Sequence, residues 1–356
     1  MVTPAGSSAS LHPVTTTTLV GTWLRTCRKW MLSKGTLTDA MLLRAAAKRS
    51  ARVVLPMVGS TQTSAIRPRE IRLAANGIDF VALECGTGPL ALCMHGFPDT
   101  AQTWRHLLPV LADAGFHAVA PFMRGYSPTS VAQNGAYQTA ALAGDANALH
   151  DALGGDDRAV IIGHDWGASS AYGAAIVSPE KWKRVVGLSV PPWGAIPNAF
   201  VSNIDQLQRS WYMFLFQHPL ADFVVSANNF AFIDLLWSQW SPGYSAEFDL
   251  QEVKKALADP IHLQAALGYY RATLGTGFRD PALNDAQTSI QGDTPPQPTL
   301  YLHGRNDGCI GLKVAQDAST RAPTHSLVRI VDDAGHFLHL EQPTIVNDLI
   351  LNWITQ

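Results

Sequence analysis

Short apolar runs alternate with longer segments of helical spacing along the chain from residue 71 onward. The stretch IRLAANGIDFVALECG (71–86) contains two runs joined by Asn76–Gly77, a dipeptide typical of a tight β-hairpin turn. Further runs that are short and apolar enough to be buried strands are LALCMHG, HAVAPFMRGY, AVII, VVGLSV, PTLYLHG and SLVRIVDD. These segments predict a sheet whose strands lie mostly inside the molecule.

Helical spacing follows several of these strands. We expect helices over 104–114, ending at Gly115, over 142–153, ending before Gly154–Gly155, directly after residue 165, and over 343–354. Strands that alternate with helices pair in parallel and are covered on both faces. The sequence therefore predicts an α/β fold with a mostly parallel central sheet flanked by helices.

The alternation disappears between about 191 and 293, where helical patterns and aromatic residues occur without a convincing buried strand. We expect a helical lid inserted between two strands, with the linker DTPPQPT (293–299) returning the chain to the sheet. The predicted organisation is a basic N-terminal extension (1–65), the first part of the core (66–192), the lid (193–293) and the second part of the core (294–356).

The N-terminal extension carries many Lys and Arg residues against a single acid, Asp39. Within it, apolar positions between Val20 and Met31 recur at helical spacing, with basic residues on the other faces. This pattern suits a basic amphipathic helix that binds a membrane surface weakly. A helix docked on the protein's own body and a poorly ordered arm are alternatives, and a transit peptide is left open.

Composition narrows the class of protein. The hydrophobic fraction of 47% and the charged fraction of 15% are those of an ordinary globular protein. A formal net charge of -2 gives no reason to expect a nucleic-acid partner. The four cysteines are scattered without metal-ligand spacing, which favours a reduced, cytoplasmic setting. No apolar run is long enough to span a bilayer, and both a monomer and a homodimer are left open.

The stretch GHDWGA (163–168) follows the apolar run AVII and precedes a helix of small residues. Glycines on both sides of a central residue let strand and helix approach closely, so that the middle side chain, Asp165, stands clear of the sheet. The helix N-terminus favours an anion there. Asp165 is therefore a candidate nucleophile, with a plain helix cap as the alternative.

Two other residues are expected at the same edge of the sheet. HGRNDG (303–308) follows the strand PTLYL and places Asp307 at its carboxyl end. DDAGHFLHLEQP places His336 after the last strand. Because ligand chemistry collects at the carboxyl ends of parallel strands, we expect both residues beside Asp165, with Asp307 orienting His336.

MHGFPDT (94–100) follows another buried strand and supplies a loop made of His95, Gly96, Phe97 and Pro98. The backbone N–H groups of Phe97 and of Trp166, which follows the nucleophile, are the expected donors to a developing oxyanion. We expect His95 to brace this loop and not to take part in the chemistry.

An aspartate nucleophile restricts the reaction. A serine that attacked a saturated carbon would form an ether, whereas Asp165 forms an alkyl ester that water, activated by His336, can cleave. The substrate is therefore an epoxide or an alkyl halide. An epoxide oxygen needs a proton, for which the lid offers Tyr212, Tyr269 and Tyr270.

The motifs HGFP, MRGY, GHDWG, HGRNDG and GHFLHLEQP together resemble the epoxide hydrolases of the α/β-hydrolase superfamily, from about Ile71 to the C-terminus. The resemblance implies an α/β-hydrolase fold with a lid, Asp165 as nucleophile, Asp307 and His336 as its partners, and a diol product. It also implies Tyr212 and Tyr270 as proton donors, with Tyr269 as the fallback for the second. The partners it implies are a small apolar epoxide and water, with no metal and no organic cofactor.

Two rival functions remain at this point. A haloalkane dehalogenase would use the same Asp165, with Trp166 as a donor to the halide, but such enzymes tend to have another donor where this chain has Phe97. A non-catalytic binding protein on the same scaffold is the rival from another class. Apolar lid residues suggest a fairly large apolar substrate, although packing within the lid gives the same composition; they are Phe214, Phe216, Phe223, Phe230, Phe232, Leu235, Leu236 and Trp237.

Overall fold

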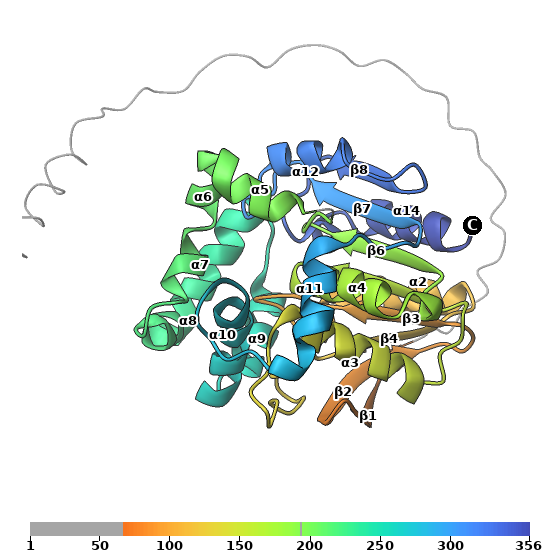
Figure 1. The fold of residues 1–356 in the computed structure, drawn as a ribbon, viewed down its shortest axis with the longest axis horizontal. Helices are drawn as coiled ribbons and strands as arrows, with labels where there is room; N and C mark the ends of the chain where they lie inside the picture. Colours follow the sequence, from red (N-terminus) through yellow and green to blue (C-terminus); the bar gives the residue numbers. More distant parts are fainter. Residues whose placement is uncertain (1–66, 193) are drawn as a thin grey trace, which may run out of the picture. The chain divides into compact units, whose positions relative to one another are not determined.

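The computed structural model describes residues 67–192 and 194–356 and contains an eight-stranded sheet (Figure 1). The strand order is β1-β2-β4-β3-β5-β6-β7-β8, and all pairs are parallel except β1–β2 and β2–β4. The mostly parallel sheet expected from the sequence is confirmed. The strands are β1 (Arg69–Ala75), β2 (Ile78–Cys85), β3 (Leu90–Met94), β4 (His117–Pro121), β5 (Val160–His164), β6 (Arg184–Leu188), β7 (Thr299–Gly304) and β8 (Leu327–Val331).

The predicted hairpin is present between β1 and β2. Its two turn residues, Asn76 and Gly77, have φ of 49° and 71°, in the left-handed region that a tight hairpin turn requires. The side chain of Asn76 also donates to Asp145 at 2.8 Å, which ties the turn to the helix that follows β4.

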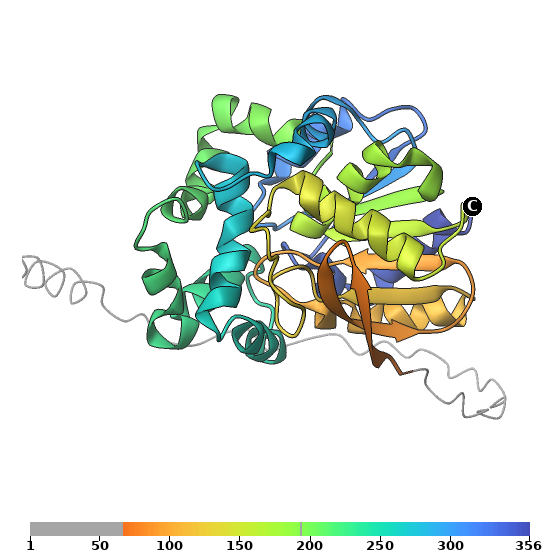
Figure 2. The same cartoon turned by 60° about the horizontal axis from the view of Figure 1, so that its bottom comes forward.

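Helices cover both faces of the sheet, as Figures 1 and 2 show. Residues of β3 alternate between two apolar clusters: Leu92 and Met94 pack with α3 and α4, whereas Ala91 and Cys93 pack with α2 and α14. This period of two is what a strand buried on both faces requires. The covering helices are α2 (Leu108–Asp113), α3 (Thr139–Ala152), α4 (Trp166–Val177), α12 (Leu312–Ser319), α13 (Leu338–Glu341) and α14 (Pro343–Ile354).

The single helix predicted over 104–114 is wrong. The structure has a 3₁₀ helix η1 (Ala101–His106), capped by the side chain of Thr100, followed by the separate helix α2. Pro109 lies in the first turn of α2; because proline has no N–H, one helix through this position would lose a hydrogen bond. A second 3₁₀ turn, η2 (Pro179–Lys181), leads into β6, and α12 has no counterpart among the predicted helices.

The described lid residues 194–292 form helices joined by turns and short loops, without a strand, and α8 is interrupted by non-helical backbone at Ala227–Phe230. Figure 1 shows most of its helices gathered at the end of the sheet toward which the arrow of β7 points. The last helix, α11, packs instead against α3 and α4 of the core. The lid elements are α5 (Ala195–Ser202), α6 (Ile204–Arg209), α7 (Trp211–Leu215), α8 (Ala221–Trp240), α9 (Glu247–Ala256), α10 (Pro260–Leu274), η3 (Pro281–Leu283) and α11 (Asn284–Gly292).

The predictions for the N-terminal extension, including its amphipathic helix, lie outside the described residues. Within 67–356, leaving aside position 193, no helix has the length and apolarity to cross a membrane. The cysteines in this part of the chain, Cys85, Cys93 and Cys309, are unpaired and buried.

Candidate active site

Asp165 occupies a strained turn between β5 and α4. Its φ of 54° and ψ of -117° lie in a region that non-glycine residues rarely adopt, and the side chain is 5% exposed. A Cβ on Gly163 would lie 2.1 Å from the carbonyl oxygen of Gly167, and one on Gly167 would lie 2.0 Å from that of Met94. Both flanking positions therefore require glycine, because the turn brings strand and helix into backbone contact.

Replacing Gly167 by alanine should lower the free energy of unfolding by about 3 kcal/mol, at the upper end of overpacking costs. The obstructing atom belongs to the backbone of β3, which is paired with β5 and cannot move aside. A matched control is Gly292→Ala in α11, where a Cβ would meet nothing within 4 Å; its effect should stay below about 0.5 kcal/mol. Urea unfolding followed by tryptophan fluorescence measures both, and equal midpoints would contradict the steric explanation.

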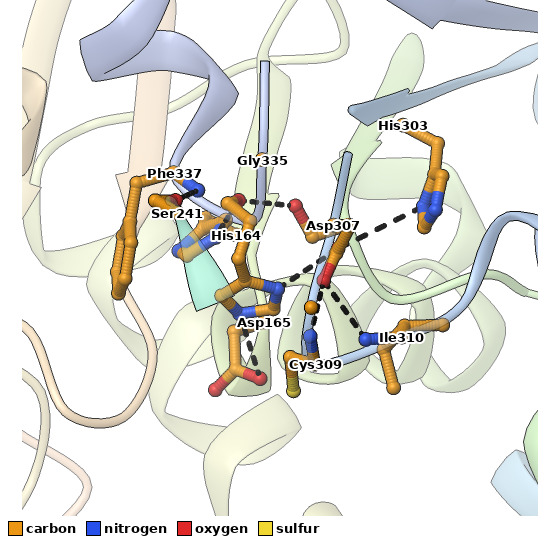
Figure 3. A network of polar contacts seen from close by, with 12 residues as sticks. His164, Asp165, Ser241, His303, Asp307, Cys309, Ile310, Gly335 and Phe337 are labelled. Atoms are coloured by element: carbon orange, nitrogen blue, oxygen red, sulfur yellow. Dashed lines mark hydrogen bonds and ion pairs between the residues drawn. The ribbon is translucent and has the colours of Figure 1, made fainter. Parts of the chain in front are cut away.

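Asp165, His336 and Asp307 meet at the carboxyl ends of β5, β8 and β7. Nε2 of His336 lies 3.7 Å from Oδ2 of Asp165, and its Nδ1 is 3.0 Å from Oδ2 of Asp307. The other oxygen of Asp307 accepts from the backbone N–H groups of Cys309 and Ile310 at 2.7 and 2.8 Å. Figure 3 follows this network from Asp165 to Asp307 and on to Cys309 and Ile310. The carboxylate of Asp307 is thus fixed from behind and orients the imidazole.

The two carboxylates and the imidazole set one another's charge. Burial alone would lower the pKa of His336, but the charges of Asp307 and Asp165 and its contacts with both raise that pKa well above its ordinary value. Burial alone would raise the pKa of Asp165, yet its interactions with His336 and the Phe97 N–H hold that pKa below the usual range. The resting site therefore contains an anionic Asp165 beside a protonated His336.

The loop after β3 approaches Asp165 closely. The backbone N–H of Phe97 donates to Oδ1 of Asp165 at 2.9 Å, and a Cβ on Gly96 would lie 2.4 Å from the same oxygen. Nε2 of His95 accepts from the N–H of Met123, and the carbonyl of Pro98 accepts from Trp237 of the lid. The loop is thus held between β4 and the lid.

Trp166, the other predicted oxyanion donor, begins α4 directly after the nucleophile. In the described part of the chain its backbone N–H makes no hydrogen bond to the Asp165 carboxylate. One of the two predicted donors is therefore already in contact with the carboxylate, and the other lies at the helix N-terminus beside it.

The three candidate tyrosines differ in their hydrogen bonds. The hydroxyl of Tyr269 donates to the carbonyl of Arg124 at 2.8 Å, so it is engaged with the core. The hydroxyl of Tyr270 is buried without a partner among the described residues, and its side chain lines the same cavity as Asp165. That of Tyr212 lies 3.4 Å from Sγ of Cys309. The rings of Tyr212 and Tyr270 meet edge to face at 5.8 Å.

Burial raises the pKa of Tyr212 and of Tyr270 well above 10, and the negative charge of Asp165 adds to the increase in both. Each is therefore a weaker acid than a tyrosine in water, and the sequence analysis had used the ordinary pKa of a tyrosine in water. Because the charge of Asp165 contributes to the increase, a change that removed this charge would lower the pKa of both hydroxyls.

A buried polar cluster behind His336 escaped the sequence argument. Asp99, His164 and His339 each direct one atom toward the others, and the three atoms lie within 4.8 Å of one another. Nε2 of His164 lies 3.0 Å from the carbonyl oxygen of His336. Burial raises the pKa of Asp99 and lowers that of both histidines, which favours the neutral form of each. The available signal was that the three residues belong to the motifs MHGFPDT, GHDWGA and DDAGHFLHLEQP.

A cavity of about 440 Å³ reaches Asp165, within the range typical of small-molecule sites. Its walls are mainly apolar and come from α4, α5, α10, α11 and the segment after β6. None of the apolar lid residues highlighted in the sequence lines it. Phe216 packs against Phe97 and Trp237 stacks on Phe337, both in the core, whereas Phe214 and Phe223 are more than half exposed. The composition of these residues therefore gives no information on the size of the substrate.

Comparison with known proteins places this geometry in a family. Residues 89–343 match the family described as alpha/beta hydrolase fold. The chain is 30% identical to an epoxide hydrolase of Caballeronia sordidicola, over 80% of this chain and 93% of that protein. It is 28% identical to epoxide hydrolase A of Mycobacterium tuberculosis, over 81% of this chain and 98% of that one.

Solved structures agree with this assignment. The crystal structure of an epoxide hydrolase of Vigna radiata superposes with a TM-score of 0.67 at 25% identity, covering 81% of this chain and 98% of that one. A putative epoxide hydrolase of Klebsiella pneumoniae gives a TM-score of 0.70 at 24% identity, with the same coverage. The chain therefore belongs to the α/β-hydrolase fold family and, within it, to the epoxide hydrolases.

Proposed function

We propose that this enzyme converts epoxides to vicinal diols through a covalent ester on Asp165. The observation that carries the proposal is the division of labour between the two oxygens of this carboxylate. Oδ1 accepts a hydrogen bond from the Phe97 N–H at 2.9 Å, whereas Oδ2 lies 3.7 Å from Nε2 of His336. The restrained oxygen suits the carbonyl of an ester, and the other suits attack on carbon.

In the first step, Oδ2 of Asp165 attacks an epoxide carbon and the bond from that carbon to the epoxide oxygen breaks. The departing oxygen takes a proton from Tyr270, whose side chain lines the cavity, or from Tyr212, whose ring packs against it. A halide would need no such proton, so the paired tyrosines favour the epoxide over the haloalkane.

In the second step, His336 removes a proton from water, which attacks Cγ of the ester. The negative charge develops on Oδ1, where the Phe97 N–H already donates. Alkylation has by then removed the charge of Asp165, one of the causes that hold the pKa of His336 high. The imidazolium passes its proton to the tyrosinate left by the first step, so the imidazole becomes a base when the ester forms. The ester C–O bond at Cγ breaks, the diol oxygen takes the proton that His336 removed from water, and the new carboxyl group of Asp165 returns its proton to the imidazole.

Isotope labelling tests this route. In a single turnover in ¹⁸O-enriched water, the label should enter the carboxylate of Asp165, because water attacks Cγ and the diol receives an oxygen that began in the protein. Mass spectrometry of the peptide containing Asp165 measures the label. Direct incorporation into the diol would overturn the covalent mechanism.

Tyr270→Phe should lower kcat/KM for styrene oxide by at least about 10²-fold, the range in which one acid catalyst acts, and Tyr212→Phe should also lower it. Both changes remove one hydroxyl and keep the edge-to-face packing of the rings. Tyr269→Phe is the matched control; it should lose about 1 kcal/mol of stability with the Arg124 hydrogen bond and keep its activity within a few-fold. Equal losses in all three variants would remove the catalytic distinction between these tyrosines.

Chloride release from simple chloroalkanes, assayed beside diol formation, separates the two chemistries. We expect diol from the epoxide and no halide release. If halide is released instead, and an enzyme that carries both Tyr212→Phe and Tyr270→Phe keeps that activity, the enzyme is a dehalogenase.

A further inference from the structure

The cavity at Asp165 has a buried end and an exposed end. Asp165, Trp166 and Tyr270 form the first and are each at most 8% exposed. The exposed end is lined by Gln291, near the end of α11, and by Asp293, just beyond it; both residues are exposed. Pro197 of α5 and Leu274 of α10 also line the cavity and are exposed, so a substrate enters between α5, α10 and α11 and reaches the carboxylate with its reactive end first.

The cavity follows one face of α4 for most of the helix. Trp166, Ser169, Tyr172 and Ile176 all line it, at the spacing of three and four residues that places side chains on one helix face. The rise from 166 to 176 is about 15 Å. An extended chain advances about 1.2 Å per bond, so about a dozen bonds span this length.

The buried end leaves little room beyond the carboxylate. Phe97, Tyr212 and Phe216 lie there, are fully buried, and pack edge to face with centroid distances of 5.4 and 5.5 Å. None of the three lines the cavity. An epoxide placed at Asp165 therefore has space for a substituent on one side, which favours a terminal epoxide.

The charge of the walls restricts the far end of the substrate. Among the described residues that line the cavity there is no lysine, arginine or histidine, and the charged side chains are Asp165 and Asp293. A carboxylate on the tail would meet no cation and would lie near the acid at the mouth. Gln287 and Gln291 supply neutral polar groups in the same region.

From these features we propose that the enzyme selects long, uncharged terminal epoxides. The tail lies between Ile176 of α4 and Ile290 of α11, which bound the outer part of the cavity. Ile290 packs closely on α4, since its Cδ1 is 3.0 Å from the place of a Cβ on Gly173. This substrate class rests on the epoxide chemistry proposed for Asp165.

A chain-length series tests the proposal. We expect kcat/KM to rise from epoxybutane to epoxydodecane, by up to about fourfold per buried methylene. Ile176→Trp should lower the value for epoxydodecane by at least about tenfold and leave that for epoxybutane within about twofold. The matched control is Val177→Trp, at the next position of α4, where the side chain is 41% exposed and does not line the cavity.

A second pair of variants keeps the test independent of how well one protein folds. Ile290→Trp should reproduce the selective loss on the long epoxide, and Ser289→Trp, at an exposed neighbour on α11, should not. Melting temperatures accompany each assay.

Two epoxides of equal length, ending in a hydroxyl or a carboxylate, test the charge of the walls. We expect the carboxylate to react at least about tenfold more slowly at low salt, with Asp293→Lys narrowing the difference. A value of kcat/KM independent of chain length, or equal reaction of both tails, would overturn the proposed substrate class while epoxybutane is still hydrolysed. Failure to hydrolyse any epoxide, the short ones included, would overturn the proposed function itself.

Discussion

Asp165→Asn should reduce kcat for epoxide hydrolysis by at least about 10⁴-fold, as expected when a covalent nucleophile is lost. Asparagine has nearly the same shape, so its amide oxygen can still accept from the Phe97 N–H. It lacks the negatively charged oxygen that attacks the epoxide carbon, so the ester cannot form. The same change removes one of the charges that raise the pKa of His336, which should therefore fall. Diol formation measures the first effect, and NMR titration of the imidazole measures the second.

The control for this variant is Asp285→Asn on the exposed surface of α11, which should leave kcat unchanged. Slow deamidation would restore the aspartate, so activity that appears after a lag agrees with the mechanism and can be matched to a mass increase in the peptide. Full activity in the first turnover, with the amide intact, would show that Asp165 is not the nucleophile.

His336→Gln should separate the two chemical steps. Asp165 can still attack, because its carboxylate and the tyrosines are unchanged, but no base remains to activate water. We expect one equivalent of epoxide to be consumed, followed by turnover slower by about 10³- to 10⁴-fold. Intact-protein mass spectrometry should show the added mass of the epoxide, and digestion should locate it at Asp165.

His325→Gln, at an exposed position before β8, is the control and should turn over normally. A His336→Gln enzyme that never accumulates the adduct and still hydrolyses the epoxide slowly would favour direct attack of water. The trapped ester is the more informative outcome, because it also gives a stable complex in which the position of the substrate chain can be determined.

The meeting of Asp165, Asp307 and His336 at one edge of the sheet was predictable because the position of each is determined locally. Asp165 lies between glycines that only a tight strand–helix turn requires, and Asp307 and His336 follow apolar runs that end at one edge of the sheet. A parallel sheet brings such ends together whatever the details of the intervening segments. For the same reason the hairpin at Asn76–Gly77 was predictable from two residues.

Features that depend on packing between distant segments were not predictable. Whether Tyr269 or Tyr270 lines the cavity depends on how α10 is rotated; Tyr270 lines it, whereas Tyr269 donates to the carbonyl of Arg124. The walls of the cavity depend on α11 packing against α4, more than a hundred residues away in sequence. Likewise the orphaned atoms of Asp99, His164 and His339 come together only in the folded chain.

The lid lies between β6 and β7, which are hydrogen-bonded neighbours in the sheet. The ends of this long insertion are therefore held close together by strand pairing, and the entropy of closing it rises by only about 0.6 kcal/mol for each doubling of its length. Tyr212 and Tyr270 belong to the insertion, whereas Asp165, Asp307 and His336 belong to the sheet. Exchange of this one segment would replace Tyr212 and Tyr270 and keep Asp165. The junction between β6 and β7 is therefore a position at which related enzymes can diverge in the leaving group that they accept.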